Sequence, residues 1–181
     1  MRQLIIPVLL MVSLAAWFGP CVFEGTAHAQ DGKWGFGTDI GFWAGTTNDT
    51  VFALGFNLDY YLDPAFSFGP MLMITPVGDL TQIAMAGVAR YHLRLRSINI
   101  VPFAGLGLIH AALDRGSGPS RIDKNDTSHF IPLGVAAEYQ LGPKIALSTT
   151  LMINLHDLNL DPPIGQDDNS VALMFGMRFG P

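Results

Sequence analysis

Residues 145–156 read Ile-Ala-Leu-Ser-Thr-Thr-Leu-Met-Ile-Asn-Leu-His, and this stretch decides the fold class. The odd-numbered positions carry Ile, Leu, Thr, Leu, Ile and Leu, whereas the even-numbered positions carry Ala, Ser, Thr, Met, Asn and His. Successive side chains of a β-strand point to opposite faces, so a period of two residues predicts a strand with one apolar and one small or polar face.

The same alternation recurs on both sides of this stretch. We expect eight strands, at about residues 34–44, 51–61, 66–75, 81–93, 98–110, 131–139, 145–156 and 170–179. Pro102 has no backbone donor, so we expect a bulge or a local break in the fifth strand. An even number of antiparallel strands can close into an up-and-down barrel.

The composition of the minor face indicates which side of this barrel is outside. That face is mostly Gly, Ala and Ser, whereas a face in contact with water would carry Lys, Glu and Thr at most such positions. The interior of an eight-stranded barrel is narrow and requires small residues. The sequence therefore predicts an all-β, eight-stranded antiparallel transmembrane barrel. A soluble, lipocalin-like periplasmic carrier, with the apolar face inside, is the alternative.

The first 29 residues have the layout of a secretory signal peptide. Arg2 precedes an apolar run at residues 4–18, and Ala27-His28-Ala29 forms a cleavage site, so the barrel domain would span residues 30–181. The apolar run is shorter than the roughly 20 residues of a membrane-spanning helix. Cys21 is the only cysteine and would leave with the signal, so we expect no disulfide.

The charge balance argues against nucleic acid as a partner. The net charge is −5, and it remains −5 after cleavage because Arg2 and Glu24 are both lost. Nucleic-acid-binding proteins carry a basic patch, which this composition does not supply.

A few ionisable residues lie on the face expected to point inward. They are Asp59, Arg90, His92, Glu138 and Arg178. Buried charges require partners of opposite sign, so we predict an interior ion-pair network that fills the barrel. A proton or ion pathway is the alternative.

Aromatic residues gather near both ends of the expected strands, as they do at the two interfaces of membrane barrels. One end carries Trp34, Tyr60, Tyr61, Phe66, Tyr91, Tyr139 and Phe179; the other carries Phe42, Trp43 and Phe130. We predict that these residues are interfacial.

From Trp34 to Phe179 the chain resembles the small outer-membrane β-barrel family that includes the OmpA transmembrane domain and OmpX. The closing stretch Val-Ala-Leu-Met-Phe-Gly-Met-Arg-Phe, residues 171–179, is similar to the family's C-terminal assembly signal. The resemblance implies the outer membrane of a Gram-negative cell, contact with outer-membrane lipid and lipopolysaccharide, and insertion by the barrel-assembly machinery.

The same family hosts enzymes, so an outer-membrane lipid A-modifying hydrolase is an alternative function. Its candidate groups are Ser128, His129 and Glu138, or Ser148, His156 and Asp157. Along an extended strand Glu138 lies roughly 30 Å from His129, and Ser148 roughly 26 Å from His156. We therefore expect no catalytic residues.

No cofactor or metal site is expected either. The acidic segment 157–168 opens like a calcium-binding loop, but Pro162 stands where that loop needs a glycine. The function expected from the sequence is a non-enzymatic outer-membrane barrel with a structural, envelope or surface-interaction role. It would present exposed loops at residues 111–128 and 157–169 to an external partner that the sequence does not identify.

Overall fold

A computed structural model describes residues 34–46, 49–76, 80–115, 122–161 and 165–180. The predicted signal peptide, residues 1–29, lies outside the described residues. The strands are β1 (Trp34–Thr46), β2 (Asp49–Asp63), β3 (Phe66–Thr75), β4 (Leu80–Tyr91), β5 (Leu93–Leu95), β6 (Ile98–Arg115), β7 (Ile122–Gly142), β8 (Ile145–Asp161) and β9 (Gly165–Phe179).

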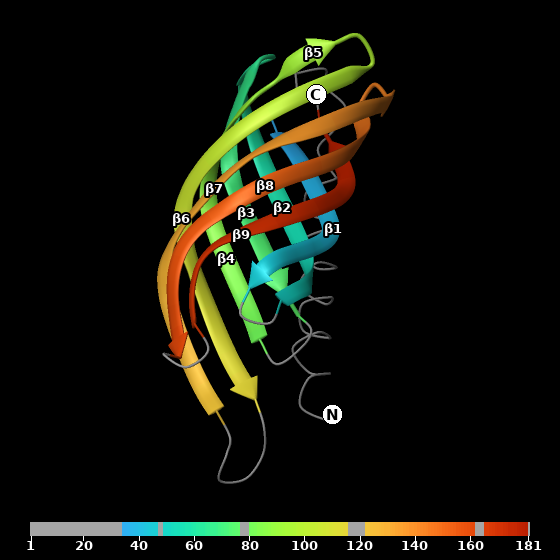
Figure 1. Ribbon diagram of the computed structural model, residues 1–181. Helices are drawn as coiled ribbons and strands as arrows, with labels where there is room; N and C mark the ends of the chain where they lie inside the picture. Colours follow the sequence, from blue (N-terminus) through green and yellow to red (C-terminus); the bar gives the residue numbers. More distant parts are fainter. Residues whose placement is uncertain (1–33, 47–48, 77–79, 116–121, 162–164, 181) are drawn as a thin grey trace, which may run out of the picture. The chain divides into compact units, whose positions relative to one another are not determined.

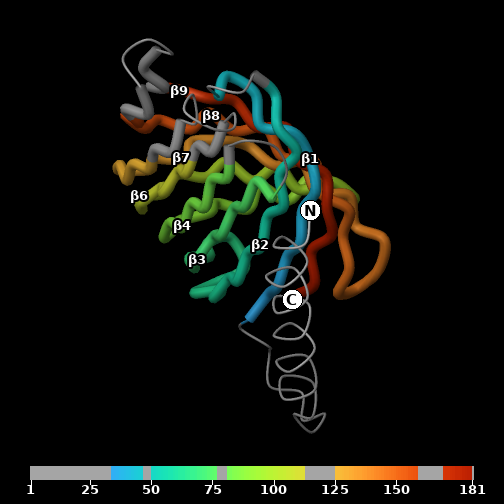
Figure 2. The backbone as a smooth tube through the Cα atoms, turned by 90° about the horizontal axis from the view of Figure 1, so that it is seen from below, coloured from blue at the N-terminus to red at the C-terminus, as the bar shows by residue number. Residues whose placement is uncertain are grey.

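These strands form one closed antiparallel barrel. Apart from β4 and β5, strands that follow one another in sequence pair with each other; β1 pairs with β9, and β4 pairs directly with β6 (Figures 1 and 2). The short β5 continues β4 along the same edge of β6 and in the same register, so the nine labelled strands make eight barrel strands. This confirms the predicted fold class. We call the end where β1 begins and β9 finishes the terminal end, and the opposite end the hairpin end.

Pro102 affects its partner strand rather than its own. β6 runs through Pro102, which pairs with Val135 of β7. On the other side, the ladder has no pair between Arg90↔Phe103 and Leu93↔Ile100, and the gap lies opposite Pro102. The missing backbone donor thus accounts for the interruption between β4 and β5. The expected break is real, but it falls in the neighbouring strand.

The two predicted long loops are largely strand, which corrects the sequence-based boundaries. β6 and β7 stay paired from Ala111↔Asp126 to Arg115↔Ile122, and β8 and β9 pair as far as Asp161↔Gly165. Figure 1 shows β6 and β7 extending beyond the other strands at the hairpin end. Backbone groups make the ladder, so pairing continues where apolar alternation stops.

The outer face of the barrel is apolar around its circumference. Large side chains such as Leu106, Met85 and Phe42 are 68%, 62% and 56% exposed. So large a contiguous apolar surface is unfavourable in contact with water and favourable in contact with lipid. This polarity is the reverse of a lipocalin-like carrier and corrects that alternative. Among the described residues, no helix is long and apolar enough to cross a membrane.

Side chains fill the interior, and their chemical type changes from one end of the barrel to the other. Charged residues lie toward the terminal end, and methionines occupy the middle, at Met71, Met73, Met152 and Met174. Trp43 is fully buried toward the hairpin end. Alternation placed Met152 and Met174 on the inner face, but the less regular third strand left the faces of Met71 and Met73 unpredicted.

Candidate functional site

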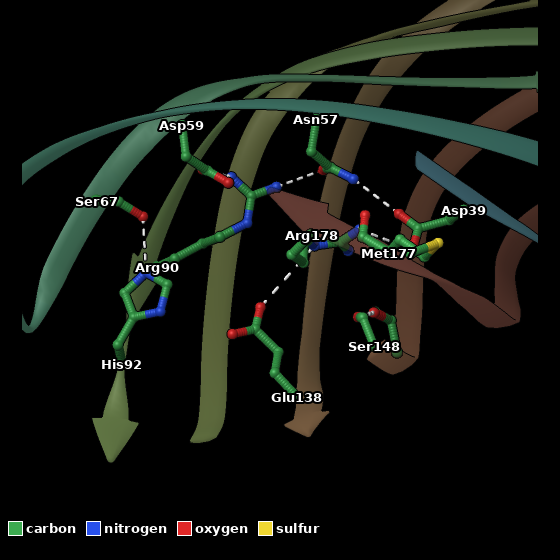
Figure 3. Close-up of polar contacts among 11 residues, drawn as sticks. Asp39, Asn57, Asp59, Ser67, Arg90, His92, Glu138, Ser148, Met177 and Arg178 are labelled. Atoms are coloured by element: carbon green, nitrogen blue, oxygen red, sulfur yellow. Dashed lines mark hydrogen bonds and ion pairs between the residues drawn. The ribbon is translucent and has the colours of Figure 1, made fainter. Parts of the chain in front are cut away.

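A continuous chain of polar contacts crosses the interior of the barrel near the terminal end (Figure 3). Arg90 makes an ion pair with Asp59, and its second nitrogen donates to Asn57 Oδ1 at 2.5 Å. The Asn57 amide then donates to Asp39 Oδ2 at 2.8 Å. The amide thus bridges a cation and an anion, using its oxygen toward one and its nitrogen toward the other.

Arg178 extends this chain to the opposite wall. Its Nη1 donates to Asp39 Oδ1 at 2.9 Å, and its Nε lies 3.9 Å from Glu138 Oε1. Three carboxylates, from Asp39, Asp59 and Glu138, therefore share two guanidinium groups. We call these five residues and Asn57 the interior network. Pairing offsets the cost of burying these charges in the barrel interior.

The backbone makes room for the network at two glycines. A Cβ on Gly37 would lie 2.6 Å from Arg178 Nη1, and a Cβ on Gly176 would lie 2.0 Å from the Thr38 carbonyl oxygen and 2.2 Å from Asp39 Oδ1. At Gly176 the added Cβ would meet backbone, so the close approach of β1 and β9 requires glycine there, whereas at Gly37 it would meet the Arg178 side chain. The small residues of the inner face therefore leave space for the few large side chains that point inward.

The structure brings four of the five ionisable residues named from the sequence into one network. His92 lies apart from the network's hydrogen bonds and contacts Ser67, with 2.9 Å between Nε2 and Oγ. Asp39 and Asn57 were not predicted to belong to the network, although both lie on the inner face of their strands. The alternation that placed Asp59 inward applies equally to Asn57, two residues earlier, and could have identified it.

Two small cavities flank the network. One, of about 20 Å³, lies among Asp39, Asn57 and the methionine layer, and the other, of about 30 Å³, opens at the terminal end. Glu138 and Arg178 line both. A water molecule needs roughly 10–15 Å³ of such space, so each cavity has room for only a few groups of that size. The interior described here is packed.

Three of the predicted interfacial aromatics point inward, which corrects their assignment. Trp43 and Phe130 are fully buried, 6.0 Å apart between ring centroids, and Tyr61 lines the terminal cavity beside the His92 ring. Adjacent residues of a strand face opposite sides, so Phe42 outside requires Trp43 inside, and Tyr60 outside requires Tyr61 inside.

The other aromatics lie on the outer face, where the ladder pairs them across strands. Trp34 packs edge-on against Tyr60 at 4.9 Å, and Phe66 pairs with Tyr91. Tyr139, Phe179 and Phe42 are exposed.

A second, uncharged polar cluster lies inside toward the hairpin end. Ser170 Oγ accepts from the Trp43 indole, lies 3.4 Å from Asn154 Nδ2 and lies 3.1 Å from His156 Nε2. Trp and amide nitrogens only donate, so the serine hydroxyl donates to the imidazole. Within the described residues, both side-chain atoms of Gln82 and Asn154 Oδ1 are buried without a hydrogen-bond partner.

Neither candidate hydrolytic triad is assembled. Ser148 contacts Thr150, and His156 contacts Ser170 instead of Ser148. Ser128 Oγ lies 3.3 Å from His129 Nδ1, but Ser128 also accepts from the Asp157 backbone, and Glu138 belongs to the interior network. In the part of the chain that the structure describes, no group of three or more His, Cys, Asp or Glu is placed to hold a metal ion.

Comparisons with known proteins identify the fold. No protein-family model matches the chain, and no curated protein matches it significantly. Neisserial surface protein A has a similar crystal structure, with TM-score 0.60 and 16% identity over 82% of this chain and 96% of that one. The N-terminal β-barrel domain of OprF from Pseudomonas aeruginosa gives 0.54 and 14% over 83% and 98%. The fold is that of the small eight-stranded outer-membrane β-barrels.

Proposed function

We propose that this chain is an integral outer-membrane protein with a structural, envelope or surface-interaction role. The observation that carries the proposal is the polarity of the barrel: among the described residues, the outer wall exposes large apolar side chains, whereas the interior holds paired charges and cavities of about 20 and 30 Å³. Such a wall is stable in lipid, and such an interior supports the wall without forming an open pore.

The orientation follows from the ends of the strands. The terminal end, with its short turns, faces the periplasm, and the extended β6–β7 and β8–β9 hairpins face outward, as in bacterial barrels. The N-terminal segment 1–29 would direct export, and the barrel-assembly machinery would insert the folded wall. Outer-membrane lipid and lipopolysaccharide surround it, and the two hairpins are offered to an external partner.

We further propose that the barrel is not an enzyme. In support, the Ser128 hydroxyl is held by the Asp157 backbone, and the His156 imidazole is used by the buried Ser170. A serine nucleophile needs a base within hydrogen-bond reach and a third group that orients the base. The competing function, lipid A hydrolysis, would require such a triad near the membrane surface.

The test combines location with activity. Cells expressing the full chain are fractionated, and the membrane fraction is run on gels with and without boiling. Outer-membrane recovery with heat-modifiable migration is expected, and recovery as a soluble periplasmic protein would overturn the proposal. The purified protein should release no fatty acid from lipopolysaccharide; release that is lost in Ser128→Ala or Ser148→Ala would establish the hydrolase instead.

A further inference from the structure

Two cations at the terminal end of the barrel have no carboxylate partner. Arg94, on β5, and Lys144, in the turn between β7 and β8, both line the terminal cavity. Within residues 34–180 as described, neither side chain makes a hydrogen bond or an ion pair. Arg96, two residues beyond Arg94, is also exposed but does not line the cavity.

The carboxylates that line this cavity are already engaged. Asp59 is paired with Arg90, and Glu138 is hydrogen-bonded by the Asn99 side chain. Arg178, the remaining arginine of the lining, donates to Asp39. The interior network has three carboxylates and two guanidinium groups, so the two cations Arg94 and Lys144 leave one positive charge unbalanced at the mouth.

These two residues lie on different elements of the barrel and line one cavity. β5 lies beside β6, whereas the turn that holds Lys144 joins β7 to β8. Guanidinium and ammonium groups both donate strongly to oxyanions, and a guanidinium can donate two parallel bonds to one phosphate or carboxylate. Tyr61 and Gln140, which also line the cavity, carry neutral donors.

The size and position of the cavity restrict the ligand. Its volume of about 30 Å³ has room for a small polyatomic ion or a single acidic group. It opens at the terminal end of the barrel, and a soluble ligand can enter it there from the aqueous phase.

We propose that the terminal mouth binds a small soluble oxyanion, a phosphate or a carboxylate group, between Arg94 and Lys144. The bound oxygens accept from both cations and link the β5 edge to the β7–β8 turn. This site is independent of the hairpin end and of the role proposed above for the whole barrel. It would give the barrel a ligand on its periplasmic side.

The test is a titration of the purified full-length barrel, in uncharged detergent, with inorganic phosphate and separately with acetate. Binding is followed by NMR shifts of the Arg94 and Lys144 backbone amides, against sodium chloride at equal ionic strength. Arg94→Gln and Lys144→Gln should each weaken binding about tenfold or more, because each removes charge-assisted hydrogen bonds. Saturation by either probe supports the site and identifies the acidic group.

Arg96→Gln is the matched control, since it removes the same charge from the same hairpin outside the cavity. Its affinity should equal that of the unchanged chain. Equal weakening in all three variants would show nonspecific attraction, and failure of both anions to saturate would overturn the site directly. Heat-modifiable migration of each variant verifies that its barrel is folded.

Discussion

Arg90 illustrates how the barrel accommodates charge in its interior. Its side chain is 7% exposed and bonded to both Asp59 and Asn57. A buried pair is stable only while both partners remain, because removing one leaves an uncompensated charge in a medium of low polarity. The same pair can often be replaced as a whole by apolar residues at little cost.

Arg90→Met should therefore lower the free energy of unfolding by about 3–5 kcal/mol. The double variant Asp59→Leu/Arg90→Met should recover most of that loss. Urea unfolding of the lipid-inserted barrel, followed by gel mobility, measures both. Arg96→Met serves as the control, because this arginine is exposed and outside the network. A single variant that unfolds at the urea concentration of the unchanged chain would contradict the assigned role of the pair.

Gly176 gives a steric prediction at the same scale. Gly176→Ala places a Cβ about where the Thr38 oxygen and the Asp39 carboxylate already lie, at 2.0 and 2.2 Å. Strands β1 and β9 would have to separate locally, so we expect a reduced folded fraction in the heat-modifiability assay. Gly142→Ala is the matched control, since nothing lies within 4 Å of its added Cβ. Equal folding of both variants would show that the barrel seam adapts to the added methyl group.

At the scale of elements, strand length separates the structure from the sequence pattern. Alternation of apolar residues predicts only the segment of a strand whose outward-facing side chains are apolar. The β6–β7 hairpin continues past that part through backbone pairing as far as Arg115↔Ile122. The sequence therefore located the strands and underestimated their extent.

Hydrogen exchange tests this extension. Paired amides in the ranges 111–115 and 125–128 should exchange more slowly than unstructured amides, because the ladder protects them. Mass spectrometry of exchanged peptides from the detergent-solubilised barrel measures the rates, with the fully unfolded chain in urea as the reference. Exchange at the unfolded rate throughout 111–128 would contradict the strand extension and support the loop predicted from the sequence.

At the scale of the whole molecule, the interior network, the methionine layer and the buried Trp43–Phe130 pair lie in series inside one barrel. Cavities of about 20 and 30 Å³ do not form a passage for solutes. Eight strands enclose a space that side chains can fill. We therefore expect that the barrel does not conduct solutes across the membrane.

Liposome swelling measures this property. Vesicles containing the purified barrel should be no more permeable to a small sugar than vesicles without protein, because the filled interior excludes solutes. A general porin reconstituted at the same protein-to-lipid ratio provides the positive control. Swelling comparable to that of the porin would show that the packed interior opens in the membrane.

The sequence by itself determined the fold class, the positions of the strands and, for most residues, the face on which each side chain lies. These properties are local, since a period of two residues fixes the side of the sheet without reference to any other strand. The same local rule could have turned Trp43 and Tyr61 inward, because each is adjacent to an outward-facing aromatic residue.

Only the tertiary structure decided which inward residues meet. Asp39 and Arg178 are separated by 139 positions and come together because β1 pairs with β9 when the barrel closes. The register of the β1–β9 pair, together with the registers of the other strand pairs, determines how far along the barrel axis each inward side chain lies. Alternation gives the direction of a side chain, whereas strand register determines its neighbours, and the interior network depends on both.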